Sequence, residues 1–135
     1  MDRLSPAKRS WNMGRIKNKN TEPEVIVRRL LHNQGFRFRL HTKNLPGSPD
    51  IVLPKYKTVI FVHGCFWHRH SHCADATTPK TRTDFWESKF LENINRDKKN
   101  HAALLATGWK VLIVWSCEVR NTSQLLMRLT EEILG

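Results

Sequence analysis

A chain of 135 residues with 39% hydrophobic residues has the size and apolar content of one domain with one core. It holds no apolar run long enough to cross a bilayer, and no apolar segment follows the basic and polar residues 1–19, as a signal peptide would require. We therefore expect a single cytoplasmic domain over residues 1–135, of bacterial type and associated with the nucleoid, whose three cysteines are reduced thiols.

Positive charge is concentrated near the N-terminus. The net charge is +11, and residues 1–43 hold eleven Lys and Arg against three Asp and Glu, a net charge of +8. A basic third on a small domain is typical of proteins that bind nucleic-acid phosphates. A solvated face on an ordinary basic protein is the alternative, and charge alone does not separate DNA from RNA.

The first part of the chain predicts a basic arm followed by a helix. Residues 1–20 have no strong period, and we expect an arm or short helix that contacts nucleic acid. Thr21 is the expected N-cap, with Pro23 in the first turn, Glu24 closing a capping box and Gly35 ending the helix. The apolar positions of this helix are Ile26, Leu30 and Leu31.

A hairpin is expected next. Residues 36–40 alternate apolar and basic side chains, which predicts a half-buried strand. Residues 51–53 and 58–62 are short β-branched runs separated by a turn at residues 54–57, so they should pair.

The remaining elements alternate between helix and strand. Residues 64–83 should be irregular, and residues 84–107 should form a long helix that Gly108 ends. Residues 109–115 are nearly all apolar, which predicts a strand buried on both faces, and Asn121 should cap a last helix. The long helix carries an apolar stripe of Trp86, Phe90, Ile94, His101 and Leu104, and the last helix one of Leu125, Leu129 and Ile133. The whole is one α/β domain with a mixed sheet.

Cysteine and histidine side chains form a candidate zinc site. Residues 65–73 hold two cysteines and three histidines, and Cys117 follows the apolar strand far along the chain. Three thiolates and one imidazole make a closed tetrahedral zinc site, which is structural rather than catalytic. Cys65, Cys73 and Cys117 are the expected ligands, with either His70 or His72 as the fourth. Three unrelated buried thiols are the alternative.

A carboxylate beside the remaining histidines suggests a second metal. Asp50 begins the strand 51–53, and the hairpin should bring His63 close to it. In a basic protein this combination suggests Mg²⁺-assisted hydrolysis of a phosphodiester, with Asp50 as the oxygen ligand and a histidine acting on water or on the leaving oxygen.

Two further carboxylates have two interpretations each. Glu24 is either a capping-box residue or part of the site. Asp97 lies on the apolar stripe of the long helix, where an unpaired carboxylate is costly, so we expect a histidine or cation beside it. A buried ion pair and a site residue are both compatible with that position.

Four segments resemble the very short patch repair (Vsr) family of DNA mismatch endonucleases. They are Ser48–Asp50, Phe61–His68 with the unusual string Gly-Cys-Phe-Trp-His, Thr81–Trp86 and Gly108–Cys117. The resemblance extends from about Ser10 to Cys117, most of the chain. It implies a restriction-endonuclease-like α/β core, with a mixed central sheet flanked by helices, and a structural zinc.

The resemblance also implies site roles. Asp50 and the backbone carbonyl of Val62 would bind Mg²⁺, and His68 would be the general base. His63, Glu24 and Asp97 would support the site. Val62 is a departure, because the best-studied pattern of the family has threonine there.

Aromatic residues are implied to wedge into DNA beside a mismatch. Phe66, Trp67 and Trp86 match these residues, while Met13 and Ile16 match apolar residues of an arm that enters the minor groove. Lys89 is a further residue that we expect to contact DNA. A mismatched pair is cheaper to unstack, so deformability would give specificity. For zinc, counting from Cys65 selects His70, with His72 as the fallback, because the loop is one residue longer than the family pattern.

The expected function is strand-specific, Mg²⁺-dependent nicking 5′ of the mispaired thymine in a T:G mismatch that arises from deaminated 5-methylcytosine. A monomer suffices, because a nick on one strand requires one active site. Two alternatives stay open: a restriction-type endonuclease without mismatch specificity, and a zinc-stabilised DNA-binding module without catalysis.

Overall fold

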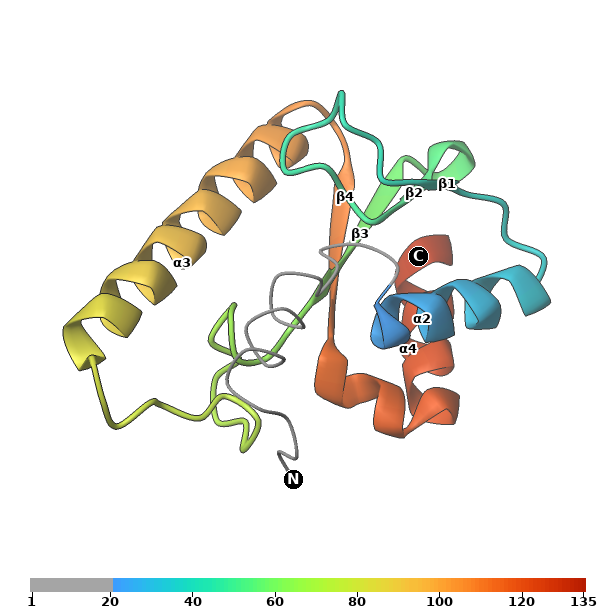
Figure 1. Ribbon diagram of the computed structural model, residues 1–135. Coiled ribbons are helices and arrows are strands. Elements are labelled where there is room, and N and C mark those ends of the chain that lie inside the picture. Colours follow the sequence, from blue (N-terminus) through green and yellow to red (C-terminus); the bar gives the residue numbers. More distant parts are fainter. Residues whose placement is uncertain (1–20) are drawn as a thin grey trace.

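A four-stranded mixed sheet forms the centre of the computed structural model, which describes residues 21–135 (Figure 1). The strands lie in the order β1 (Arg39–Leu40), β2 (Ile51–Leu53), β3 (Thr58–His63) and β4 (Lys110–Trp115). β1 pairs with β2 and β2 with β3 in antiparallel fashion, whereas β3 and β4 are parallel. The predicted hairpin and mixed sheet are therefore confirmed.

Helices cover both faces of the sheet. α3 (Thr83–Ala106) lies on one side, and α2 (Glu22–Asn33) and α4 (Thr122–Leu134) lie together on the other (Figure 1). Side chains alternate between the faces of a strand, so Ile60 packs toward α2 and α4 while its neighbours Val59 and Phe61 pack toward Leu104 of α3. Within residues 21–135, no helix is both long and apolar enough to cross a membrane.

The larger core lies between the sheet and the α2–α4 pair. Its helical residues follow helical spacing, and those of α4 are the three predicted from its stripe. Its fully or almost fully buried members include Val27, Leu31, Ile60, Val114, Leu125, Leu129 and Ile133.

Most predicted helix ends are confirmed. Gly35 follows α2 and Gly108 follows α3, each with φ of +90°, a conformation that glycine adopts without a steric cost. The side chain of Asn121 accepts a hydrogen bond from the Gln124 backbone N–H at 3.1 Å, so the predicted cap of α4 is present. In the described part of the chain, the short 3₁₀ turn η1 (Pro54–Tyr56) joins β2 to β3, and a second one, η2 (Ser116–Arg120), joins β4 to α4.

Two strand predictions need correction. Of residues 36–40 only Arg39 and Leu40 pair, because Phe36 donates its backbone N–H to Leu31 at the end of α2 and packs there in the core. β4 is fully buried on one face only, because Leu112 and Val114 lie in the core beside α2 and α4 whereas Val111 and Ile113 on the other face are half-buried. An apolar run thus marked a strand but not how closely each of its faces is covered.

Candidate active site and cysteine cluster

A cleft of about 530 Å³ opens between the loop before β2, the end of β3 and the middle of α3. The β2–β3 hairpin brings Asp50 beside the end of β3, as expected from the sequence. Gly47 lets the loop approach α3, because a Cβ atom there would lie 3.1 Å from Asn100 Cβ and the φ of Gly47 is +75°. The cleft is lined by His41, Lys43, Gly47, Ser48, Asp50, Phe61, Val62, His63, His68, Arg96, Asp97, Asn100 and His101.

The backbone of β3 holds Asp50 in place. The Val62 backbone N–H donates a hydrogen bond of 2.7 Å to Asp50 Oδ2. Burial raises the pKa of Asp50, the Val62 hydrogen bond lowers it and the nearby carboxylate of Glu24 raises it, so that the pKa lies at about 7. Two carboxylates so close together repel each other unless a proton or a cation lies between them. The pair therefore fits a hard divalent cation, which prefers oxygen ligands.

Glu24 faces this site rather than capping its helix. No side-chain cap bonds the start of α2, and the Glu24 side chain is only 2% exposed. Arg28 Nη2 donates to Glu24 Oε2 at 2.7 Å, and His41 Nε2 lies 3.1 Å from the same oxygen. The capping-box interpretation is wrong because these two groups draw the carboxylate inward, away from the helix end.

Arg28 and His41 were missed in the sequence. Arg28 follows Glu24 by four residues, which is the spacing of a helical ion pair and could have indicated the contact. His41 follows β1 and reaches Glu24 only through the fold, so nothing local pointed to it. The ligand atoms of Glu24, His41 and Asp50 lie within 4.8 Å of one another.

A histidine–aspartate pair forms the other wall of the cleft. His68 Nδ1 and Asp97 Oδ2 are 2.6 Å apart, so Asp97 has the histidine partner that its position predicted. Because a carboxylate only accepts, the Nδ1–H donates and Nε2 is left as the acceptor of a neutral ring. The His63 ring stacks on His68 with centroids 3.8 Å apart. Burial, and then repulsion from His68 in its protonated form, lower the pKa of His63 to about 3, so His63 is neutral at physiological pH.

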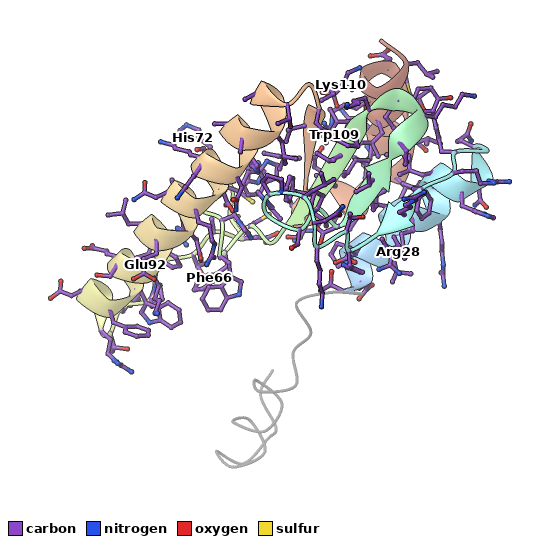
Figure 2. All side chains as sticks on the ribbon, turned by 90° about the horizontal axis from the view of Figure 1, so that it is seen from above. Arg28, Phe66, His72, Glu92, Trp109 and Lys110 are labelled. Atoms are coloured by element: carbon purple, nitrogen blue, oxygen red, sulfur yellow. The ribbon has the colours of Figure 1, made fainter. Side chains whose placement is uncertain are left out.

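An aromatic cluster lies along the N-terminal half of α3, where Figure 2 shows Phe66. We define it as Phe66, Trp67, Trp86 and Phe90. Phe66 is its centre, with ring centroids 5.1 Å from Trp67, 5.6 Å from Trp86 and 5.2 Å from Phe90. Trp67 is 43% exposed, so it is not an ordinary core residue. Trp67 and His68 are consecutive, and one faces the cluster while the other faces the cleft.

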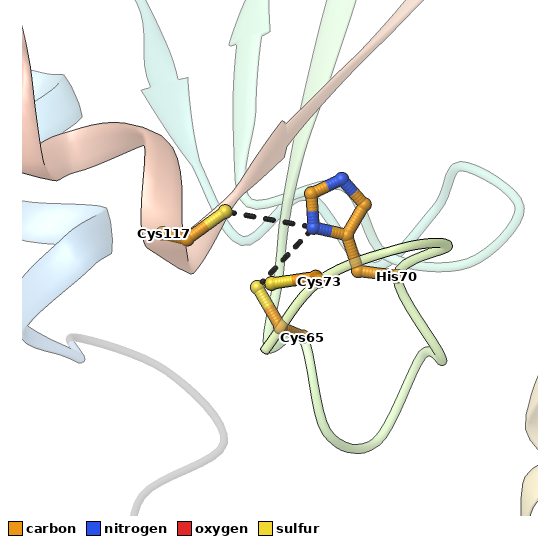
Figure 3. Close-up of side chains that lie close together, drawn as sticks. All are labelled: Cys65, His70, Cys73 and Cys117. Atoms are coloured by element: carbon orange, nitrogen blue, oxygen red, sulfur yellow. Dashed lines mark hydrogen bonds between the residues drawn. The ribbon is translucent and has the colours of Figure 1, made fainter. Parts of the chain in front are cut away.

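Three thiols and one imidazole meet where the loop after β3 reaches the end of β4 (Figure 3). His70 Nδ1 lies 3.6 Å from Cys65 Sγ and 3.5 Å from Cys117 Sγ, and Cys73 joins the group. His72 is exposed and does not belong to the group, so the geometry favours His70 over the fallback. Burial and the neighbouring thiols Cys65 and Cys73 raise the pKa of Cys117 to about 12. A soft cation bound by sulfur would favour the thiolate forms, so this donor set fits zinc.

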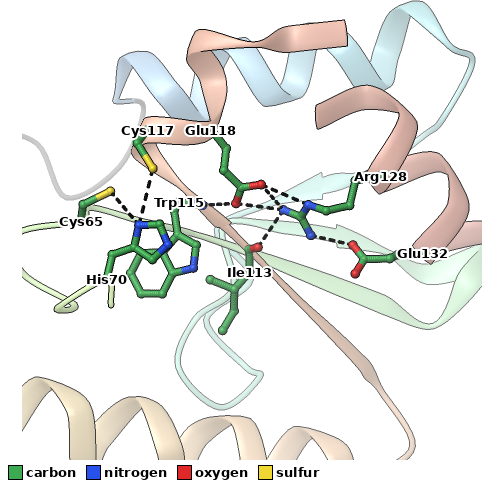
Figure 4. A network of polar contacts seen from close by, with 8 residues as sticks. All are labelled: Cys65, His70, Ile113, Trp115, Cys117, Glu118, Arg128 and Glu132. Atoms are coloured by element: carbon green, nitrogen blue, oxygen red, sulfur yellow. Dashed lines mark hydrogen bonds and ion pairs between the residues drawn. The ribbon is translucent and has the colours of Figure 1, made fainter. Parts of the chain in front are cut away.

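The end of β4 fixes the imidazole and the third thiol. The His70 ring stacks on Trp115 with centroids 4.2 Å apart, and Cys117 lies in η2 just beyond. The Trp115 backbone N–H donates to Glu118, whose carboxylate receives two hydrogen bonds from Arg128 of α4 (Figure 4). Arg128 also donates to Glu132 and to the Ile113 carbonyl. The group of Cys65, His70, Cys73 and Cys117 is thereby attached to α4 as well as to the sheet.

The family model of the DNA mismatch endonuclease Vsr matches residues 1–75, more than half of the chain. The chain belongs to the Vsr family. It is 44% identical over 128 residues to the DNA mismatch endonuclease Vsr of Escherichia coli, covering 95% of this chain and 79% of that one. It is 52% identical over 128 residues to the type II nicking enzyme V.XorIIP of Xanthomonas oryzae pv. oryzae, covering 95% and 93% of the two chains. This Vsr-family protein is therefore a DNA-cleaving hydrolase.

The Vsr-family chain also shares its fold with a solved nuclease. It is similar to the catalytic domain of the homing endonuclease I-Bth0305I, with a TM-score of 0.61 and 20% identity over 85% of this chain and 96% of that one. The mixed sheet flanked by helices is thus the restriction-endonuclease-like core that was expected.

Of the remaining residues that were expected to contact DNA, the structure of this Vsr-family chain describes Lys89. Lys89 is on α3 with half of its side chain exposed, near Glu92 and the Phe85 ring. Met13 and Ile16, with the basic arm of residues 1–20, lie outside the described residues.

Proposed function

We propose that this protein nicks one strand of duplex DNA on the 5′ side of the mispaired thymine in a T:G mismatch. The observation that carries the proposal is the side-by-side placement of the cleft, with Asp50 and the His68–Asp97 pair, and an aromatic cluster whose Trp67 is exposed. One site can cut a phosphodiester and the other can unstack a base step. The names of the relatives, a mismatch endonuclease and a nicking enzyme, support both parts.

Asp50, with the backbone carbonyl of Val62, would hold Mg²⁺, and Glu24 would add negative charge beside it. Bound there, the ion supplies Lewis-acid stabilisation of the charge that develops on the phosphate. Arg28 and His41 keep Glu24 in place, and the Val62 N–H holds one oxygen of Asp50 by a hydrogen bond.

His68 would take the proton from the attacking water. Asp97 fixes its tautomer, so Nε2 is available as a base, and stabilises the imidazolium that forms. His63, stacked on His68 and neutral, can donate a hydrogen bond to a phosphate oxygen without competing for the proton. The two imidazoles therefore have different roles although they lie in contact.

The cluster of Cys65, His70, Cys73 and Cys117 would bind a structural zinc. The loop after β3 has few backbone hydrogen bonds within it and few apolar residues. It therefore cannot be held in one conformation by a hydrophobic core of its own. A closed site would join this loop to the end of β4 and so position both Trp67 and His68.

Phe66, Trp67 and Trp86 would enter the DNA beside the mismatch. Unstacking costs less at a mismatched step, which makes the wedge selective. Lys89 would contact DNA next to the cluster, and Met13 and Ile16 of the basic arm would act from the minor groove.

The proposal is tested by strand-resolved cleavage of labelled duplexes that carry T:G or matched C:G in one sequence context, with Mg²⁺ or with EDTA. We expect Mg²⁺-dependent nicking of the thymine strand of the mismatched duplex only. Equal cleavage of both duplexes would instead make the protein a restriction-type endonuclease. Binding without any cut would leave a zinc-stabilised DNA-binding module.

An Asp97→Asn variant is expected to nick the T:G duplex roughly 100-fold or more slowly, since general base catalysis contributes about that much. The carboxamide can donate to Nδ1, which would leave the proton on Nε2 and remove the base. Single-turnover rates with saturating protein measure the effect. Asp84→Asn, an exposed change on the same helix, should cut normally, and an unchanged rate for Asp97→Asn would remove the pair from the mechanism.

A Trp67→Ala variant is expected to lose about tenfold in its preference for the mismatched duplex, because stacking on a base contributes about 1–3 kcal/mol. Equilibrium binding to T:G and C:G duplexes in EDTA gives the ratio. Leu105→Ala removes an exposed apolar side chain on α3 outside the cluster and should keep the preference. An equal loss of affinity for both duplexes would show that Trp67 does not discriminate.

A further inference from the structure

The side chain of Arg69 donates four hydrogen bonds to other residues of its own loop, which joins β3 to α3. From Nη1 it donates to the carbonyl oxygens of Phe66 at 3.1 Å and Thr77 at 2.9 Å. From Nη2 it donates to the Ala76 carbonyl and to Thr78 Oγ1, each at 3.1 Å. A planar guanidinium can hold four acceptors in fixed directions, which a lysine cannot. The side chain thus joins the start of the loop to residues 76–78.

The same guanidinium also lies on the aromatic cluster. Its carbon is 4.1 Å from the Phe90 ring centroid and 5.7 Å from that of Phe66. A cation over an aromatic face is attracted to it, and Arg is the usual partner. Arg69 therefore touches α3, through Phe90, and the centre of the cluster, through both the ring and the carbonyl of Phe66.

The backbone around Arg69 cannot hold this shape by itself. Arg69 has a φ of +54° and His72 one of +56°, a left-handed conformation that is unfavourable for side chains other than glycine. Within residues 64–82, few backbone–backbone hydrogen bonds are formed inside the loop. The backbone N–H groups of His68, His70 and Ala76 donate to the carbonyl oxygens of Gly64, Cys65 and Cys73, respectively. Contacts from side chains must therefore keep the loop ordered.

We propose that Arg69 is a positioning residue that sets mismatch specificity by holding the aromatic cluster in its wedge shape before DNA binds. This rests on the proposed function of the cluster. A wedge that is already formed loses less conformational entropy on binding, so more of the contact free energy is available to discriminate a deformable step. Without Arg69, the loop would have to become ordered on DNA, and T:G and matched duplexes would differ less.

The test compares the unaltered 135-residue protein with Arg69→Met, Arg69→Lys and Arg82→Met. Met keeps the aliphatic stem and Lys keeps the charge, but both lose the four directed donors. Arg82 is the matched control. It lies in the same loop with a φ of +54°, and its guanidinium carbon is 4.4 Å from the Phe85 ring centroid. Within residues 21–135, its guanidinium donates no hydrogen bond to a carbonyl oxygen, in contrast to that of Arg69. Amide hydrogen exchange of residues 66–78 without DNA, the ratio of T:G to C:G affinity, zinc content and Tm are measured.

We expect both Arg69 variants to exchange amides 66–78 about tenfold faster and to lose about tenfold in the affinity ratio, with zinc content and Tm equal to those of Arg82→Met. Unchanged exchange with an equal loss on both duplexes would make Arg69 a DNA-phosphate contact and overturn the inference. Full recovery by Lys, or a fall in Tm that matches the loss of preference, would overturn it as well. If Trp67→Ala loses the preference and Arg69→Met does not, only the inference fails; if neither does, the wedge itself is wrong.

Discussion

An Asp50→Asn variant should lose nicking by roughly a thousandfold or more and still bind the T:G duplex, because single residues of a catalytic unit carry effects of this size. Asn keeps an oxygen that can accept from the Val62 N–H, so the hairpin is preserved. What it removes is the negative charge that the proposed Mg²⁺ requires. It also removes the cost of burying a charged Asp50 and its repulsion from Glu24, which together raise the pKa of Asp50, so the melting temperature should stay the same or rise.

Single-turnover nicking, thermal melting and duplex binding, measured on one preparation, check this result. Asp75→Asn makes the same chemical change at an exposed pair with Arg120, outside the cleft, and should be without effect on nicking. Substantial residual nicking by Asp50→Asn would remove Asp50 from the reaction. Loss of both melting temperature and nicking would make it a structural residue instead.

A Cys117→Ser variant is expected to lose bound zinc and about 4 kcal/mol or more of unfolding free energy, since loss of a metal is among the largest effects of a point mutation. Cys117 is far in sequence from the other three residues of its cluster, so without it a bound metal no longer links the loop after β3 to the end of β4, and the His70–Trp115 stack remains as a weaker contact. The freed Cys65 and Cys73 would remain beside His70 as an incomplete site. Zinc content after denaturation and chemical unfolding with and without chelator provide the measurement.

His70→Ala and His72→Ala form the matched pair for this prediction. His70 stacks on Trp115 inside the cluster, whereas His72 is exposed outside it, so only His70→Ala should release zinc. Release from His72→Ala alone would restore the fallback ligand. An unaltered protein that purifies without zinc and does not respond to chelator would end the structural-zinc proposal.

The order of elements could be predicted because it depends on local patterns. Gly35, Gly108 and Asn121 mark helix ends through their own backbone and side-chain chemistry. The pairing of β2 with β3 followed from a short turn between two β-branched runs. Burial of β4 could not be predicted, since how closely each face of a strand is covered depends on how the helices pack in the folded chain.

The site was predictable where residue type alone limits the chemistry. Asp97, on an apolar stripe, needed a partner and has one in His68. The orientation of Glu24 was not predictable, because a carboxylate at that position can equally close a helix end or turn inward, and Arg28 and His41 decide between them. His41 and Arg69 act through contacts made only after folding, so neither pattern nor composition indicates them.

Trp67 and His68 are joined by a single peptide bond, and their Cα atoms are therefore about 3.8 Å apart. In the proposed complex this covalent link fixes the distance between the wedge residue and the general base. The spacing between the opened base step and the broken bond would be set by that link rather than by contacts with the intervening bases. The position of the cut would then be constant across sequence contexts, even where the affinity for those contexts differs.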